Sequence, residues 1–176
     1  MKVLALSDKV DELLYSPAIK HLFGDVDLVL GCGDLPHYYL EFITTLLGGP
    51  VFYVIGNHAN EIKRYHEPKH QWEYPGGCVN LDGRVIQHKG LLIAGLEGSM
   101  RYNSREYFQY REREMARKAW GLAPSLVLNK FLHGRYLDIL ITHAPPKGIH
   151  DKPDLCHQGF RAFVTLMERF RPRYLI

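Results

Sequence analysis

The sequence predicts an α/β protein built on a parallel β-sheet. Apolar runs rich in valine, isoleucine and leucine lie at residues 3–7, 26–33 and 51–56, and each is bounded by glycine or polar residues. Runs of this kind are typical of strands that are buried on both faces. Segments with helical features separate them, so the order strand, helix, strand, helix, strand favours right-handed crossovers within one parallel sheet.

The two intervening segments carry helix signals. Residues 17–23 are expected to form the first helix, with Ser16 as its N-cap and Pro17 at the first helical position. Residues 37–47 are expected to form the second, because their apolar residues recur at close to helical spacing. The run Gly48-Gly49-Pro50 ends that helix before the third strand.

The pattern changes after the third strand. Residues 59–77 are polar and aromatic without a clean period, and we expect a long loop beside the site. Short strands are predicted at residues 78–81, 85–88 and 91–96. The turn pairs Asp82-Gly83 and Lys89-Gly90 favour antiparallel hairpins between them. A second sheet is therefore expected to pack on the first.

The last part of the chain alternates again between helix and strand signals. Residues 104–132 are predicted to be helical, with a second helix from Pro124 packed by its apolar residues, namely Leu126, Val127, Leu128, Phe131 and Leu132. Opposite charges at helical spacings between residues 110 and 118 indicate a solvated face. A strand at 137–142, a helix at 159–170 and an interrupted strand at 173–176 follow. We expect a single domain over residues 1–176 with a helical insertion around 104–133.

Composition limits the functional classes. The chain has 176 residues, 46% hydrophobic and 23% charged, which suits one soluble domain with a sizeable core. A net charge of +3 does not favour specific nucleic-acid binding. Three scattered cysteines suit a reducing compartment, and neither a signal segment nor a membrane-spanning run is visible. The sequence therefore predicts a cytoplasmic protein without a membrane partner.

Metal-ligating side chains follow four of the predicted strands. Asp8, Asp34, Asn57-His58 and His143 each stand where an apolar run ends. Ligands in α/β sheets collect at the carboxyl ends of strands, and hard divalent metals favour oxygen and imidazole donors. Asp34 is the candidate bridging ligand, with Asp8 serving one metal and Asn57 and His143 the other. Two such metals clamp a phosphoryl group, and His58 is placed to protonate the leaving alcohol.

These residues resemble the calcineurin-like metallophosphoesterases. The resemblance rests on Ser7-Asp8, Gly33-Asp34, Gly56-Asn57-His58 and Thr142-His143-Ala144-Pro145-Pro146, and it covers nearly the whole chain. It implies a four-layer α/β/β/α sandwich and hydrolysis of a phosphomonoester or phosphodiester by metal-activated water at a binuclear manganese, iron or zinc site. By position it makes Asp8, Asp34, Asn57 and His143 metal ligands and His58 the catalytic histidine.

Two departures from the family pattern affect the first metal. The family usually has Asp-x-His after the first strand, but Val10 occupies the histidine position here, with Asp11 and Glu12 as neighbours that favour solvent. The family's closing Gly-His-x-His is absent before Ile176, because the chain is truncated or because these histidines were lost. We therefore expect the metal held by Asp34, Asn57 and His143 to be the better occupied.

Other residues are candidates for contacting the substrate, a small phosphoester such as a nucleotide. Arg101 is a candidate phosphate ligand, with a surface salt bridge as the competing interpretation. His150 and His157 follow the Thr-His-Ala-Pro-Pro loop and are expected to line the cleft. Trp72 and Tyr74 are either stacking platforms for a base or ordinary packing residues.

Two further functional classes stay open beside the enzyme. The Val10 substitution and the missing histidines are compatible with a catalytically impaired relative that binds a phosphate ligand or a protein. A protein scaffold would need an exposed apolar patch, which the sequence does not reveal. We rank the enzyme first and the scaffold last.

Overall fold

The computed structural model describes residues 1–58, 74–103 and 107–176. Its first sheet is entirely parallel, and its strands stand in chain order: β1 (Val3–Leu6), β2 (Leu28–Cys32), β3 (Val51–Val54) and β4 (Cys78–Asn80). The middle strands β2 and β3 are buried along their whole length. This burial explains why their sequences are continuous apolar runs rather than alternating ones.

The second sheet is mixed. Its strands run in the order β10 (Tyr174–Leu175), β9 (Ile139–Thr142), β6 (Leu91–Leu96) and β5 (Val85–His88). Only β5 is antiparallel to its neighbour, through the hairpin at Lys89-Gly90. A short parallel pair, β7 (Ser99–Met100) and β8 (Gln109–Tyr110), extends beyond it.

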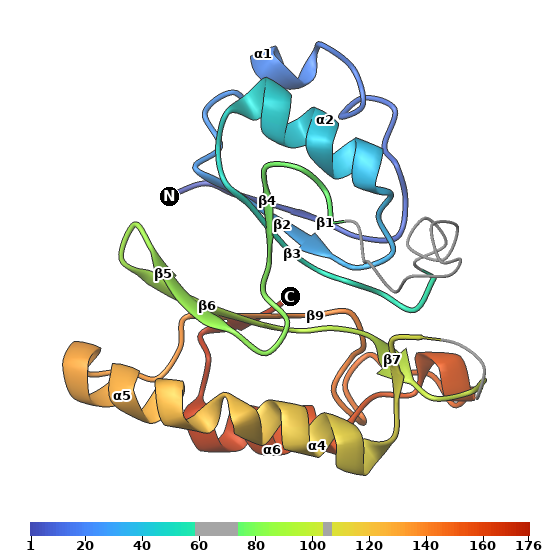
Figure 1. The fold of residues 1–176 in the computed structure, drawn as a ribbon, viewed down its shortest axis with the longest axis vertical. Helices are drawn as coiled ribbons and strands as arrows, with labels where there is room; N and C mark the ends of the chain where they lie inside the picture. Colours follow the sequence, from blue (N-terminus) through green and yellow to red (C-terminus); the bar gives the residue numbers. More distant parts are fainter. Residues whose placement is uncertain (59–73, 104–106) are drawn as a thin grey trace.

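Helices cover the outer faces of both sheets, as Figure 1 shows. Helices α1 (Ile19–Phe23) and α2 (His37–Leu47) lie on the first sheet, and α4 (Glu112–Gly121), α5 (Ala123–His133) and α6 (Arg161–Phe170) lie on the side of the second. One apolar cluster lies between the sheets and one under each helical layer. The four-layer α/β/β/α sandwich is thus confirmed. Among the described helices, none has the length and apolar character needed to cross a bilayer.

The predicted hairpin at Asp82-Gly83 is wrong. Strand β4 joins the first sheet, parallel to β3, while β5 belongs to the second sheet. The Asp82-Gly83 turn instead carries the chain from one sheet to the other, and Asp82 bridges to Gly95 of β6. Cys78 packs on the cluster beneath α2, and this contact stabilises β4 in the first sheet.

The predicted packing of helix α5 is also wrong. Of its apolar residues only Leu126 is buried, and Phe131 is 86% exposed. Three more apolar side chains of α5 are exposed, namely Val127, Leu128 and Leu132. The helix rests on its neighbours through one narrow stripe, so apolar character alone did not indicate the buried side. The exposed apolar patch that the sequence did not reveal therefore exists on α5. The helical region itself begins at Glu112, after β8, and residues 104–106 lie outside the described part of the chain.

The acidic residues of α4 are not simply solvated, contrary to expectation. The Glu112 carboxylate accepts the backbone N–H groups of Arg161 and Ala162, at 3.1 and 2.7 Å, and so caps the first turn of α6. The Glu114 carboxylate binds Arg101 at 3.0 Å. These contacts fix α4 against α6 and against the segment after β7.

Asp138 anchors the start of strand β9. Its carboxylate is 1% exposed and accepts Arg135 Nε at 2.8 Å and the backbone N–H of Leu92 at 2.9 Å. Burial alone would raise the pKa of this carboxyl, but the hydrogen bonds from Arg135 and Leu92 outweigh it and lower the pKa below its ordinary value. The carboxylate therefore ties β9 to β6 in its charged form.

We expect Asp138→Ala to lower the free energy of unfolding by about 1.5–3 kcal/mol at neutral pH, since it removes hydrogen bonds to a charged group. A depressed folded-state pKa gives stability that is present above the unfolded-state pKa and is lost as pH falls through the folded-state value. The difference between wild type and variant should therefore be smaller at an acidic pH below about 3.9, the pKa of an aspartate in the unfolded chain, than at neutral pH. Urea unfolding at both pH values measures this. Asp25→Ala, which removes an exposed ion pair with Lys2, is the control and should change little.

Candidate metal centre

The carboxyl ends of β1, β2, β3 and β9 open into one cavity of about 990 Å³. Seven predicted site residues line it: Asp8, Asp34, Asn57, His58, His143, His150 and His157. Parallel strands deliver the residues that follow them to the same edge of a sheet, which is why distant motifs converge here. Arg101 is not among the described residues that line this cavity.

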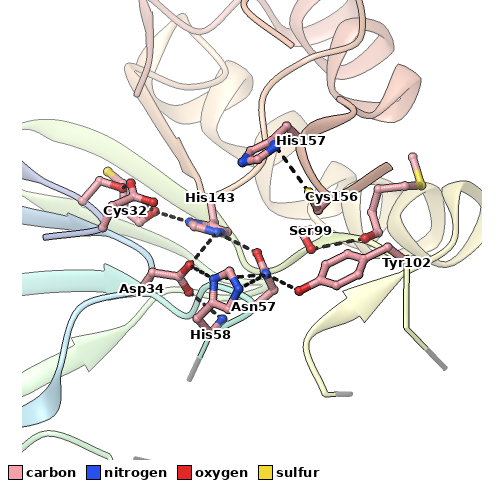
Figure 2. A network of polar contacts seen from close by, with 12 residues as sticks. Cys32, Asp34, Asn57, His58, Ser99, Tyr102, His143, Cys156 and His157 are labelled. Carbon is pink, nitrogen blue, oxygen red and sulfur yellow. Dashed lines mark hydrogen bonds and ion pairs between the residues drawn. The ribbon is translucent and has the colours of Figure 1, made fainter. Parts of the chain in front are cut away.

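Asp34 lies at the centre of the polar network that Figure 2 shows. Its side chain is 9% exposed, and Oδ1 accepts the backbone N–H of His58 at 2.8 Å. Its Oδ2 lies 2.8 Å from Nδ1 of His58 and 3.4 Å from Nε2 of His143. One carboxylate therefore contacts both His58 and His143.

His143 and Asn57 form the second part of the network. His143 Nδ1 lies 3.0 Å from the Cys32 carbonyl oxygen, which fixes the ring and turns Nε2 into the cavity. That Nε2 lies 3.0 Å from Oδ1 of Asn57. Burial raises the pKa of the Cys32 thiol to about 12, so this thiol stays protonated and contributes only its backbone carbonyl to the site.

Two glycines leave the space that this arrangement needs. Gly33 has a φ of +100°, and a Cβ there would lie 2.3 Å from Nδ1 of His143. A Cβ at Gly56 would lie 2.0 Å from Oδ1 of Asp34 and 2.6 Å from its backbone nitrogen. Asp8 and Asp34 themselves have positive φ values of 64° and 54°, a conformation that Asp tolerates better than most residues. The glycines of the Gly-Asp and Gly-Asn-His motifs are thus steric requirements.

The donors of Asp34, Asn57 and His143 fit a divalent metal. Two donors bound to one metal at about 2.1 Å lie roughly 3.0 Å apart in octahedral and 3.4 Å apart in tetrahedral geometry. The separations of His143 Nε2 from Asn57 Oδ1 and Asp34 Oδ2 are 3.0 and 3.4 Å. One carboxylate, one amide oxygen and one imidazole are also the donor types that manganese, iron and zinc accept.

The other half of the site offers fewer donors. Asp8 faces the cavity and is exposed. Its carboxylate accepts a hydrogen bond from Ser7 Oγ, and its backbone N–H donates to the Gly33 carbonyl oxygen at 3.1 Å. Val10 packs on the apolar cluster beneath α1 and α2. Asp11 accepts the N–H groups of Leu13 and Leu14, so it caps a turn instead of reaching inward. A metal beside Asp8 would therefore have only Asp8 and Asp34 from the described residues.

Arg101 forms a salt bridge with Glu114, which was the competing interpretation of this residue. Its guanidinium binds the Gln109 carbonyl oxygen at 3.0 and 3.1 Å and the Glu114 carboxylate at 3.0 Å. These contacts use the guanidinium to join β7, β8 and α4. His150 and His157 do line the cavity, and both are exposed. Of the two aromatic candidates, Trp72 lies outside the described residues and Tyr74 lines a separate pocket.

Tyr102 belongs to the site although sequence reasoning did not select it. Its hydroxyl accepts a hydrogen bond from Nδ2 of Asn57 at 3.0 Å, and Figure 2 shows the ring next to that amide. This contact leaves Oδ1 of Asn57 directed at His143. Tyr102 lies 45 residues from Asn57 in the chain and forms no recognisable motif with it, so only the fold reveals the pair.

We expect Tyr102→Phe to weaken metal binding about tenfold, the lower range for the loss of a residue that orients a ligand. The reason is that the Asn57 amide would lose the hydroxyl that fixes which of its atoms faces the cavity. Isothermal titration with Mn²⁺ measures the change. Tyr38→Phe, an exposed tyrosine on α2, is the matched control and should leave the affinity unchanged. Equal affinities of wild type and Tyr102→Phe would contradict this role.

Comparisons with known proteins agree with this architecture. A crystal structure aligns with a TM-score of 0.59 over 98% of this chain and 81% of its own chain, at 15% sequence identity, which supports the fold alone. The comparison with curated protein sequences found no match. The family model of the calcineurin-like phosphoesterases matches residues 2–176, and so spans all the strand ends that carry the cavity's polar residues. By this match the chain belongs to the calcineurin-like phosphoesterase family, whose members are generally hydrolases that bind divalent metals.

Proposed function

We propose that this protein hydrolyses a phosphomonoester or phosphodiester at the cavity formed by the four strand ends. The observation that carries the proposal is the contact of Asp34 with His58 and His143, together with an Asn57 oxygen 3.0 Å from His143. When bound, divalent metals supply the Lewis acidity that activates water and neutralises the phosphoryl oxygens.

Asp34, Asn57 and His143 are the residues that would hold the better occupied metal. Asp34 is also the candidate bridging residue, with Asp8 as the further protein ligand of a second metal. The open arrangement around Asp8 leaves room for the substrate phosphate on that side. Manganese, iron and zinc all match the donor set, so metal identity is a matter for elemental analysis of the isolated protein.

His58 is the candidate proton donor. Its side chain is 63% exposed, and Asp34 fixes the ring through Nδ1 at 2.8 Å. The other nitrogen, Nε2, has a longer contact of 3.5 Å with Asn57 Nδ2. Because Asp34 holds Nδ1 and this second contact is weak, Nε2 is the nitrogen better placed to protonate a leaving group. Water adds to phosphorus and loses one proton to solvent, and the phosphorus–oxygen bond to the alcohol breaks. The alcohol oxygen takes its proton from His58, which is then reprotonated from solvent.

The assay uses p-nitrophenyl phosphate and bis-p-nitrophenyl phosphate with Mn²⁺, Zn²⁺ or Fe²⁺ added to the protein. We expect metal-dependent release of p-nitrophenol with one ester class preferred, and loss of release when a chelator removes the metal. The impaired relative considered above predicts a different result, namely thermal stabilisation by inorganic phosphate or nucleotide without product. Absence of turnover on a broad phosphoester panel with all three metals would overturn the proposal.

A further inference from the structure

A second group of metal-ligating side chains stands on a short turn beside the cavity. Asp154, Cys156 and His157 flank or form the 3-10 turn Leu155–His157, and their ligand atoms lie within 4.8 Å of one another. Asp154 Oδ2 lies 2.8 Å from Cys156 Sγ and 2.5 Å from His157 Nδ1. Cys156 Sγ lies 3.3 Å from His157 Nδ1. A carboxylate, a thiol and an imidazole thus converge within four residues.

These three groups are hydrogen-bond partners of one another. The hydrogen bond from Cys156 is the largest of the effects that lower the pKa of Asp154 to about 2, with that of His157 second. The same hydrogen bond raises the pKa of the Cys156 thiol, so the thiol keeps its proton at neutral pH.

The turn is held in place by contacts outside the three ligand atoms. The Asp151 carboxylate accepts the N–H groups of Gly148 and Gly159, at 3.0 and 3.2 Å, and so closes the loop that carries the turn. Within it the backbone N–H of Lys152 bonds to the His157 carbonyl oxygen at 3.1 Å. A loop fixed in this way presents its donors with little further ordering, which favours binding.

The group faces the same cavity as the metal centre but does not belong to it. Cys156 and His157 line the cavity, and Figure 2 shows both above His143 and Asn57 in that view. In the described part of the chain, the side chains of Cys156 and His157 make their polar contacts with each other and with Asp154. They make none with Asp8, Asp34, Asn57 or His143. A cation held here would therefore border the space that a substrate occupies.

We propose that Asp154, Cys156 and His157 form a separate site for a thiophilic divalent cation of the zinc type. Zinc binds oxygen and nitrogen at about 2.0–2.1 Å and sulfur at about 2.3 Å, which places tetrahedral nitrogen and oxygen donors roughly 3.3–3.4 Å apart and sulfur roughly 3.5–3.6 Å from either. The sulfur–nitrogen separation of 3.3 Å is slightly shorter than this, so the exposed carboxylate has to move outward and the thiol has to shift a little. Binding replaces the thiol proton, which passes to solvent, and three protein donors leave one coordination position open to the cavity.

Cobalt(II) is the probe, because a cobalt–thiolate bond gives a charge-transfer absorption band that oxygen and nitrogen ligands do not give. We expect a titration of the metal-free wild-type protein with Co²⁺ to produce this band. Cys156→Ser should abolish it, and His157→Ala should weaken cobalt binding at least about tenfold. Cys78→Ser is the matched control and should keep the band, as should His143→Ala, which disables the other centre.

A second measurement covers zinc itself. Binding of Zn²⁺ to wild type at neutral pH should release one proton more than binding to Cys156→Ser, which calorimetry in buffers of different ionisation enthalpy detects. A wild type without the thiolate band, or a band that survives Cys156→Ser, would show that these side chains form only a hydrogen-bonded turn. The phosphoesterase assay is a separate readout, so either proposal can fail without the other.

Discussion

Asp34→Asn is expected to lower kcat of the proposed phosphoesterase reaction by at least about a thousandfold, which corresponds to roughly 4 kcal/mol of transition-state stabilisation. The substitution keeps the size of the side chain and removes its charge. The neutral amide is a poor metal ligand, and it has one acceptor oxygen where the two carboxylate oxygens now serve the backbone N–H and Nδ1 of His58. Metal content should fall together with activity, because one side chain serves both functions.

Steady-state kinetics with saturating Mn²⁺ and elemental analysis measure this pair of effects. Asp25→Asn is the control, since that carboxylate is exposed and pairs only with Lys2 in the described contacts. The thermal unfolding temperature of metal-free Asp34→Asn should stay near that of metal-free wild type, because the amide oxygen still accepts the His58 N–H. A variant that keeps more than a tenth of wild-type kcat and its metal would refute the central position of Asp34.

The sequence predicted which residues would line one cavity where they follow a strand end, namely Asp8, Asp34, Asn57, His58 and His143. Leu28–Cys32, Val51–Val54 and Ile139–Thr142 are fully buried apolar runs, as the sequence predicts for central strands. The burial predicted for the first run is wrong, because β1 (Val3–Leu6) is a partly exposed strand at the edge of its sheet. The carboxyl ends of all four strands nevertheless open into one cavity. Helix α2 was equally predictable, since Gly48 adopts a φ of 65° and ends it where the sequence indicates. Local signals and tertiary structure agree in these elements.

The sequence did not reveal features that depend on which elements become neighbours. The sequence of strand β4 is typical of the first strand of a hairpin. In the structure β4 instead pairs with the edge of β3, and its Cys78 packs on the cluster beneath α2. Helix α5 has the apolar content of a buried helix, but Leu126 is its one buried residue. Tyr102 lies after β7 and reaches Asn57 only because the two sheets stack. In each case the deciding partner is distant in the chain and leaves no local trace.

Gly56→Ala should weaken metal binding and lower activity by steric means alone. Gly56 lacks the positive φ that would make alanine strained for backbone reasons, so the single methyl group is the whole perturbation. That methyl would lie 2.0 Å from Oδ1 of Asp34 and 2.6 Å from the Asp34 backbone nitrogen. Because a backbone atom is involved, rotation of the Asp34 side chain cannot relieve the clash, and the strand ends of β2 and β3 must separate. Overpacking of this kind costs about 1–3 kcal/mol of folding free energy.

Gly121→Ala is the matched control, because a Cβ there meets nothing within 4 Å, and it should leave activity unchanged and raise stability by up to about 1 kcal/mol. Circular dichroism and urea unfolding establish that Gly56→Ala is folded, and Mn²⁺ titration then reports the site itself. We expect a folded variant with at least about a hundredfold weaker metal binding, since the loss of a merely supporting residue already costs 10–100-fold. If Gly56→Ala bound Mn²⁺ as wild type does, Asp34 would not be a ligand in the position that its contacts with His58 give it.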